Sequence, residues 1–297
     1  MTSRIVSMMG LALLTAAAGC NQPTMDPNVV TIGSTKPVYF GLPKEFRALH
    51  AGLEKHLERP VRFVAQSNGE SLGLQLEQGN YACALMSSLE YSQVADPSGL
   101  TLVASALNSA GKASRKGFVL ARKGCEIGSI ADCKGRRFAF GAYGDLLTDI
   151  ATQAALEKGG TPVGKLLPEL LTPPPFGRDG RLYMGKDVAK TILQDPTVNV
   201  GVVDELAFQA MPDTGGNFIR GPSKDQFVKL GETEAVPEMV VVASASADRQ
   251  TISDLSEYLL EKVRDDSNVC SQLGVTGFVP PDRAAYDHLH SARKDKE

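Results

Sequence analysis

The sequence predicts an α/β protein. Short apolar runs, typical of buried strands, alternate with longer segments whose apolar residues recur at spacings of three and four, typical of amphipathic helices. Strands regularly followed by helices favour largely parallel sheets covered by helices. The chain of 297 residues exceeds one typical hydrophobic core and suits two domains, with Gly/Pro-rich loops expected at 159–180 and 212–237.

Each expected element follows from its local residue pattern. The segment 43–58 carries Phe46, Leu49, Leu53 and Leu57 on one helical face. Similar patterns predict further helices at 70–77, 89–95, 145–158, 188–194 and 252–263. Continuous apolar runs predict strands at 30–34, 61–65, 81–86, 102–107, 118–121, 138–141, 198–203 and 239–243.

The N-terminal segment has the pattern of an export signal. Arg4 supplies the positive end, an apolar run follows, and small residues precede Cys20. We predict that residues 1–19 are a lipoprotein signal peptide, that Cys20 is lipidated, and that 20–29 form a polar tether. Plain secretion with an incidental cysteine is the alternative. Either way the protein lies outside the cytoplasm, on the periplasmic face in a Gram-negative host.

The charge distribution argues against nucleic acid as a partner. The formal net charge is −3, and no run of Lys or Arg appears before the C-terminal segment 293–296. No second apolar stretch is long enough to span a bilayer, so we expect the acyl chains on Cys20 to be the only membrane anchor.

The sequence shows no recognisable metal-binding or catalytic motif. The four histidines do not share metal-ligand spacing with Cys or Asp, so we predict neither a metal nor another cofactor. No nucleophile elbow, phosphate-binding loop or dinucleotide-binding motif is present, and we predict that the protein is not an enzyme. Export permits disulfides, and Cys125 and Cys133 bracket a short turn-rich loop. The sequence is compatible with a disulfide between these two cysteines and equally with two free thiols.

Four junctions between a strand and a helix are the expected ligand-binding positions. In α/β sheets, ligands bind where the carboxyl ends of strands meet the N-termini of helices. These junctions lie at 86–91, 141–145, 185–187 and 203–205.

The order of several segments resembles that of a known protein family. The segments 118–123 and 130–141 form a strand, a turn and a second strand, and they are the closest match. The segments 59–64, 84–91, 185–188 and 201–205 fit the same order and spacing. Together they resemble the phosphate/phosphonate-binding branch of the periplasmic solute-binding proteins of ABC transporters.

This resemblance implies a type II periplasmic-binding-protein fold. Two α/β lobes would be joined by a hinge of two crossover strands, and a small ligand would bind in the cleft as the lobes close. Mapped onto this sequence, lobe 1 comprises 30–112 plus 238–297, and lobe 2 comprises 113–237. An ABC permease would recognise the closed form.

The resemblance also implies which side chains contact the ligand. The hydroxyl and aromatic groups of the turns would face the cleft, and Asp204 and Glu205 match acidic family positions. Each has a structural alternative, as a helix cap or as a residue packed within or between the lobes. The candidate ligand-binding residues are Tyr39, Ser87, Ser88, Tyr91, Tyr143, Asp145, Thr148, Lys186, Asp204 and Glu205.

Asp145 departs from the family pattern and puts the ligand's identity in doubt. Phosphonate-binding members carry a Ser/Thr cluster there, and each lost neutral hydrogen bond costs about 1 kcal/mol. A carboxylate about 4 Å from an anion would oppose binding by roughly 4 kcal/mol at an effective dielectric constant of 20, which is the larger effect. Asp145 either caps the helix or selects a cationic or amino-bearing ligand. Lys186 either restores an anion site or pairs with Asp187.

Two functions therefore remain after an enzyme is set aside. The first is a lipid-anchored solute-binding protein of an ABC-type uptake system. The second is a sensory or orphan binding lipoprotein without a transport role. Asn21, directly after Cys20, does not favour retention at the inner membrane of a Gram-negative cell and so supports the second reading.

Overall fold

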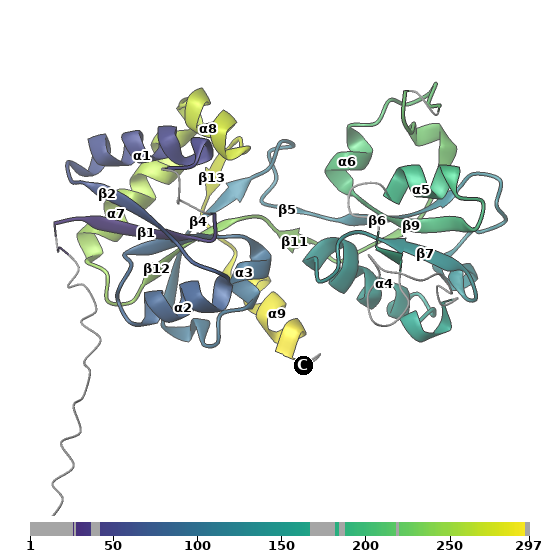
Figure 1. Cartoon of the computed structure of the whole chain (residues 1–297), viewed down its shortest axis with the longest axis horizontal. Coiled ribbons are helices and arrows are strands. Elements are labelled where there is room, and N and C mark those ends of the chain that lie inside the picture. Colours follow the sequence, from purple (N-terminus) through teal and green to yellow (C-terminus); the bar gives the residue numbers. More distant parts are fainter. Residues whose placement is uncertain are drawn as a thin grey trace, which may run out of the picture.

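The computed structural model describes residues 26, 28–36, 42–166, 182–183, 188–217 and 220–294. These residues fold into two α/β lobes that lie beside each other along the long axis of the molecule (Figure 1). Between the lobes, β5 (Ser114–Arg115) pairs antiparallel with β11 (Val236–Pro237). The predicted two-lobed fold with a hinge of two crossover strands is confirmed.

The first lobe is built on a six-stranded sheet in the order β13-β4-β12-β3-β1-β2. Its strands are β1 (Val30–Ser34), β2 (Val61–Ala65), β3 (Cys83–Met86), β4 (Leu100–Leu107), β12 (Val240–Ser244) and β13 (Gly277–Val279). Its helices are α1 (Lys44–Leu57), α2 (Gly69–Glu77), α3 (Ser88–Ser92), α7 (Arg249–Glu257), α8 (Ser267–Leu273) and α9 (Arg283–Lys294). The helices α1, α7 and α8 cover one face of the sheet, and α2, α3 and α9 cover the other.

The second lobe is built on a five-stranded sheet in the order β10-β6-β9-β7-β8. Its strands are β6 (Gly117–Arg122), β7 (Arg137–Phe140), β8 (Leu182–Tyr183), β9 (Val198–Asp204) and β10 (Phe227–Glu232). Its helices are α4 (Thr152–Lys158), α5 (Val188–Gln194) and α6 (Glu205–Gln209), and a π-helical segment, η3 (Leu146–Ala151), leads directly into α4. The helices α5 and α6 pack on one face and α4 on the other.

Strands buried on both faces explain why the sequence showed continuous apolar runs. In β3, Cys83 and Leu85 join the core on one face of the sheet, while Ala84 and Met86 join the core on the other. Successive side chains of a strand point to opposite faces, so a strand covered on both sides needs apolar residues throughout.

Both sheets are mixed, which corrects the prediction of largely parallel sheets. β12 runs antiparallel to β3 and β4, and β6 runs antiparallel to β9 and β10. Chain segments that pass through the hinge reach β6 and β12 without a preceding crossover helix. Parallel neighbours need such a helix to return the chain, so these strands are free to enter in the opposite direction.

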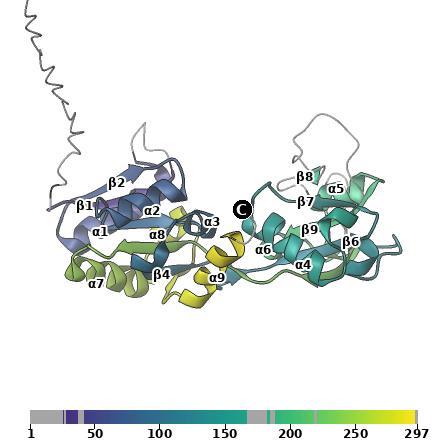
Figure 2. The same cartoon turned by 90° about the horizontal axis from the view of Figure 1, so that it is seen from below.

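A small apolar cluster joins the two lobes. Leu146 and Leu147 of η3 pack with Val236 of the hinge and with Leu289 of α9, and Leu89 lies against them. We call these five residues the junction cluster. α9, yellow in Figure 2, lies between the lobes, so the C-terminal helix belongs to the first lobe's core and also contacts the second lobe.

Cys125 and Cys133 are both free thiols, so the disulfide considered from the sequence is not formed. Cys133 is fully buried and Cys125 packs against the same core of the second lobe. Burial raises the pKa of the Cys133 thiol to about 12. Both cysteines therefore act as small apolar core residues. No helix among the described residues has both the length and the apolar character needed to cross a bilayer.

Candidate functional site

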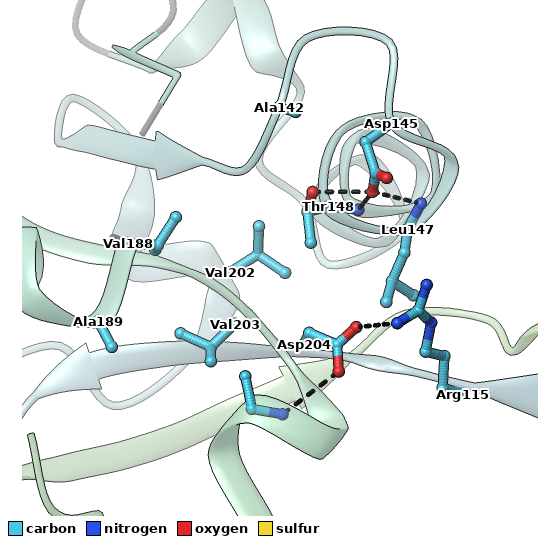
Figure 3. Close-up of a pocket in the computed structure, with 11 residues that line it drawn as sticks. Arg115, Ala142, Asp145, Leu147, Thr148, Val188, Ala189, Val202, Val203 and Asp204 are labelled. Atoms are coloured by element: carbon cyan, nitrogen blue, oxygen red, sulfur yellow. Dashed lines mark hydrogen bonds and ion pairs between the residues drawn. The ribbon is translucent and has the colours of Figure 1, made fainter. Parts of the chain in front are cut away.

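A cavity of about 500 Å³ lies in the second lobe beside the hinge (Figure 3). It forms where β7 and β9 end and where η3, α5 and α6 begin, so the expected junctions at 141–145 and 203–205 converge on it, while the junction at 185–187 lies outside the described residues. Its size is typical of sites for small molecules. Its lining comprises Arg115, Ala142, Asp145, Leu147, Thr148, Val188, Ala189, Val202, Val203, Asp204 and Ala207.

Most of the cavity wall is aliphatic. Val188 and Ala189 come from the first turn of α5, and Val202 and Val203 come from the end of β9. All four side chains are buried, and together they form an apolar surface of the cavity. A wall of this kind suits the hydrocarbon part of a ligand, while a few polar side chains set its orientation.

Asp145 caps the helical segment at one edge of the cavity. Its Oδ1 atom accepts hydrogen bonds from the backbone N–H groups of Leu147 at 3.0 Å and Thr148 at 2.7 Å. The Thr148 hydroxyl donates to the same oxygen at 2.8 Å. Asp145 is therefore a helix cap and a cavity-lining residue at once, and Thr148 is directed at Asp145.

The turn that leads into Asp145 is held in place by contacts with the helical segment that follows it. Gly141 lies so close to the helix that a Cβ atom there would come within 1.9 Å of Thr148 Oγ1. Gly144 has a φ of 74°, and its N–H donates to Oδ2 of the buried Asp149 at 2.8 Å. Tyr143, between two residues that line the cavity, is 71% exposed. The turn thus presents an aromatic ring to solvent from a fixed backbone.

Arg115 and Asp204 tie the cavity to the hinge. Nη1 of Arg115 lies 2.9 Å from Oδ2 of Asp204, and Oδ1 of Asp204 accepts the N–H of Leu206 at 2.7 Å, which caps α6. Nε of Arg115 also lies 3.5 Å from Oε1 of Glu238, just beyond hinge strand β11. Since Arg115 belongs to β5, one wall of the cavity is the hinge itself.

Glu205 turns away from the cavity, unlike its neighbour Asp204. The residue is 7% exposed, and its carboxylate accepts hydrogen bonds from Nζ of Lys112 at 2.8 Å and from the backbone N–H of Lys116 at 3.3 Å. The Lys112 hydrogen bond is the main reason that the pKa of Glu205 is lowered. The structure thus places Glu205 in an ion pair across the hinge region instead of in the ligand site.

The three candidates at the start of α3 are placed very differently from one another. Ser87 is exposed at the end of β3 and caps α3, since Glu90 N–H donates to its Oγ at 3.3 Å. Ser88 is buried, and its hydroxyl donates to the hinge carbonyls of Pro237 and Glu238. Ser88 therefore stabilises the hinge and does not face the cleft.

Tyr91 is also removed from the cleft. Its side chain is fully buried and packs edge-on against Tyr286 of α9, with ring centroids 5.5 Å apart. The Tyr286 hydroxyl donates to the Glu238 carbonyl at 3.0 Å. Of the three candidates at the start of α3, only the capping residue Ser87 is therefore exposed at the end of β3. Ser88 contacts the hinge, and Tyr91 packs against α9.

Two sequence candidates, Tyr39 and Lys186, lie outside the described residues, as does Cys20. Within the described part of the chain, no group of His, Cys, Asp and Glu side chains is arranged to hold a metal ion. Sequence reasoning missed Arg115, because the short hinge segment around it carries no motif. It also missed Val188 and Val202, which lie directly after the junction at 185–187 and directly before the junction at 203–205.

Comparisons with known proteins identify the family. A model described as "ABC transporter, phosphonate, periplasmic substrate-binding protein" matches residues 42–286. No curated protein gives a significant match to the chain.

Solved structures with the same fold cover most of the chain. XAC2383 from Xanthomonas citri, bound to ATP, has a TM-score of 0.65 and 16% identity, over 90% of this chain and 98% of that one. PhnD1 from Prochlorococcus marinus, in complex with methylphosphonate, has a TM-score of 0.61 and 13% identity, over 91% and 99%. The sulphonate-binding protein SsuA from Escherichia coli has a TM-score of 0.51 and 13% identity, over 91% and 88%.

These structures share the two-lobed type II architecture of periplasmic binding proteins, with which the fold described above agrees. The family match covers the hinge and, apart from β1, every strand of the two sheets. The chain therefore belongs to the phosphonate-type family of periplasmic substrate-binding proteins of ABC transporters.

Proposed function

We propose that this protein is a lipid-anchored, extracytoplasmic binding protein that captures a small solute in the cavity of its second lobe. The observation that carries the proposal is the cavity itself, at the ends of β7 and β9 and walled on one side by the hinge residue Arg115. A ligand held there would contact the lobe and the hinge together. It would favour the closed arrangement by binding it more tightly than the open one, without catalysis.

The solved relatives support capture of a small solute. Two of them are described in complex with ATP and with methylphosphonate, and SsuA is described as a sulphonate-binding protein. The cavity of this chain lies within the same two-lobed fold. Asp145, Thr148 and Asp204 would contact the ligand, Tyr143 would close over it from the second lobe, and Ser87 would approach it from the first.

A cavity-filling variant tests the capture site. Ala142 is exposed and lines the cavity, so Ala142→Phe should fill the entrance without disturbing a core. Ala131→Phe, at another exposed position of the same lobe, is the matched control. Mass spectrometry of small molecules released from purified protein should find a ligand in the wild type and in Ala131→Phe but not in Ala142→Phe. Equal amounts of ligand released from all three proteins would show that the cavity is not the capture site.

The membrane anchor and the partner need separate experiments. Cys20→Ala should move the protein from the membrane fraction to the soluble fraction, since acyl chains would be its only anchor. Cross-linking in cells should recover an ABC permease with the wild type. Recovery of a sensor kinase in place of the permease would support the sensory alternative that Asn21 favours.

A further inference from the structure

We propose that the cavity selects a ligand with a positively charged amine or ammonium group instead of an oxyanion. The inference rests on the proposed function, because it assigns the ligand class of the same cavity. It is carried by one carboxylate, Asp145, whose hydrogen bonds and whose lack of a cationic partner among the described residues have separate consequences.

First, Asp145 already occupies the place where an anion would bind. The free N–H groups at the start of a helix are the usual donors for a bound oxyanion. Here the N–H groups of Leu147 and Thr148 and the Thr148 hydroxyl all donate to Asp145 Oδ1, at 3.0, 2.7 and 2.8 Å. An anionic ligand would have to displace a carboxylate that is covalently attached beside these donors.

Second, among the described residues, the cavity retains one carboxylate whose negative charge no cationic side chain compensates. Its charged lining residues are Asp145, Asp204 and Arg115, and Arg115 pairs with Asp204 at 2.9 Å. Among the described residues, Asp145 has no cationic partner within salt-bridge distance, and its donors are all neutral. Figure 3 shows these hydrogen bonds converging on one carboxylate oxygen, so the other remains able to accept from a ligand.

Third, the remaining wall fits the rest of such a ligand. Val188, Ala189, Val202 and Val203 give the cavity an aliphatic side opposite the acidic edge (Figure 3). A compact alkyl or alicyclic body would bury its hydrocarbon surface there. Its cationic nitrogen would then lie against Asp145.

A second helix-capping aspartate in the same chain serves as a control that distinguishes the effect of the charge from the effect of capping. Asp248 caps α7 through the same Asp-x-x-Thr pattern, accepting the N–H of Thr251 at 2.9 Å and its hydroxyl at 3.0 Å. Asp248 lies in the first lobe and is not among the residues that line the cavity. Asn is as good a cap as Asp, so Asp145→Asn and Asp248→Asn should have matched and small effects on stability.

The test uses two probe sets of opposite charge. One contains primary and quaternary aliphatic ammonium compounds, and the other contains the matching phosphonates, sulfonates and carboxylates, including methylphosphonate. Thermal-shift screening followed by calorimetry should find binding to wild-type protein in the ammonium set alone. Asp145→Asn should weaken that binding at least tenfold, whereas Asp248→Asn should leave it within about twofold.

Several results would overturn the inference. One is a wild type that binds no ammonium probe, and another is equal ammonium binding by wild type and Asp145→Asn. A third is wild-type binding of methylphosphonate that is lost in Lys186→Ala, since Lys186 would then supply an anion site. If anions bind and Ala142→Phe abolishes their binding, the proposed capture site stands and only the ligand class fails. If ammonium probes bind Ala142→Phe as tightly as wild type, the capture site itself fails.

Discussion

Replacing Leu289 by alanine should weaken the contact between the two lobes. The Leu289 side chain is 8% exposed and packs against Leu146, Leu147 and Val236 in the junction cluster. Burial of each methylene group contributes about 0.8 kcal/mol, and Leu→Ala substitutions in cores cost about 2–5 kcal/mol. A junction between two lobes relaxes more easily than a closed core, so we expect a loss of about 2–3 kcal/mol in the free energy of unfolding.

The assay is urea unfolding followed by far-ultraviolet circular dichroism, because the chain contains no tryptophan. For a protein of this size, the expected loss would lower the melting temperature by roughly 3–5 °C. Leu74→Ala is the matched control, since Leu74 is 48% exposed on α2 and should change stability by no more than about 0.5 kcal/mol. Equal losses in the two variants would refute the packing of α9 against the second lobe.

Three further predictions concern side chains that lie outside the cavity. Ser88→Ala should cost about 1–2 kcal/mol in urea unfolding and leave ligand affinity unchanged, because its hydroxyl binds hinge carbonyls; an affinity loss at unchanged stability would contradict this. The stability advantage of wild type over Glu205→Gln should be full above the unfolded-state pKa of about 4.3 and disappear as pH falls through the lowered folded-state pKa. A pH-independent difference would argue against the Lys112 ion pair. Cys133 should resist thiol reagents until the protein unfolds, and a mass two hydrogens lighter would instead indicate the bridge to Cys125.

The elements with strong periodicity were predictable from the sequence. α1 and β3 lie close to their predicted bounds because their apolar residues report burial directly. β10 lay in a segment expected to be a loop, because as an edge strand its residues from Val228 to Glu232 are partly or fully exposed and show no apolar pattern. The amphipathic face of α9 rests on few side chains, chiefly Tyr286 and Leu289, so the sequence did not reveal it as the helix between the lobes.

Part of the candidate site was likewise predictable from the sequence, and part of it was not. Asp145, Thr148 and Asp204 were found because they follow strands, and the ends of neighbouring strands in a sheet meet at one edge. Arg115 was not found, since it comes beside Asp204 only through the antiparallel pairing of β6 with β9, which sets Gly117 opposite Asp204.

The family, the strand-to-helix junctions and the uncommon carboxylate at Asp145 were all determined by the order of residues along the chain. Which side chains of each junction face the cavity was decided by tertiary packing alone. Successive helical residues are rotated by about 100°, so adjacent positions point to different surroundings. Contacts of α3 with β11 and α9 turn Ser88 and Tyr91 inward, and Lys112 turns Glu205 away, while Asp204 remains in the cavity wall.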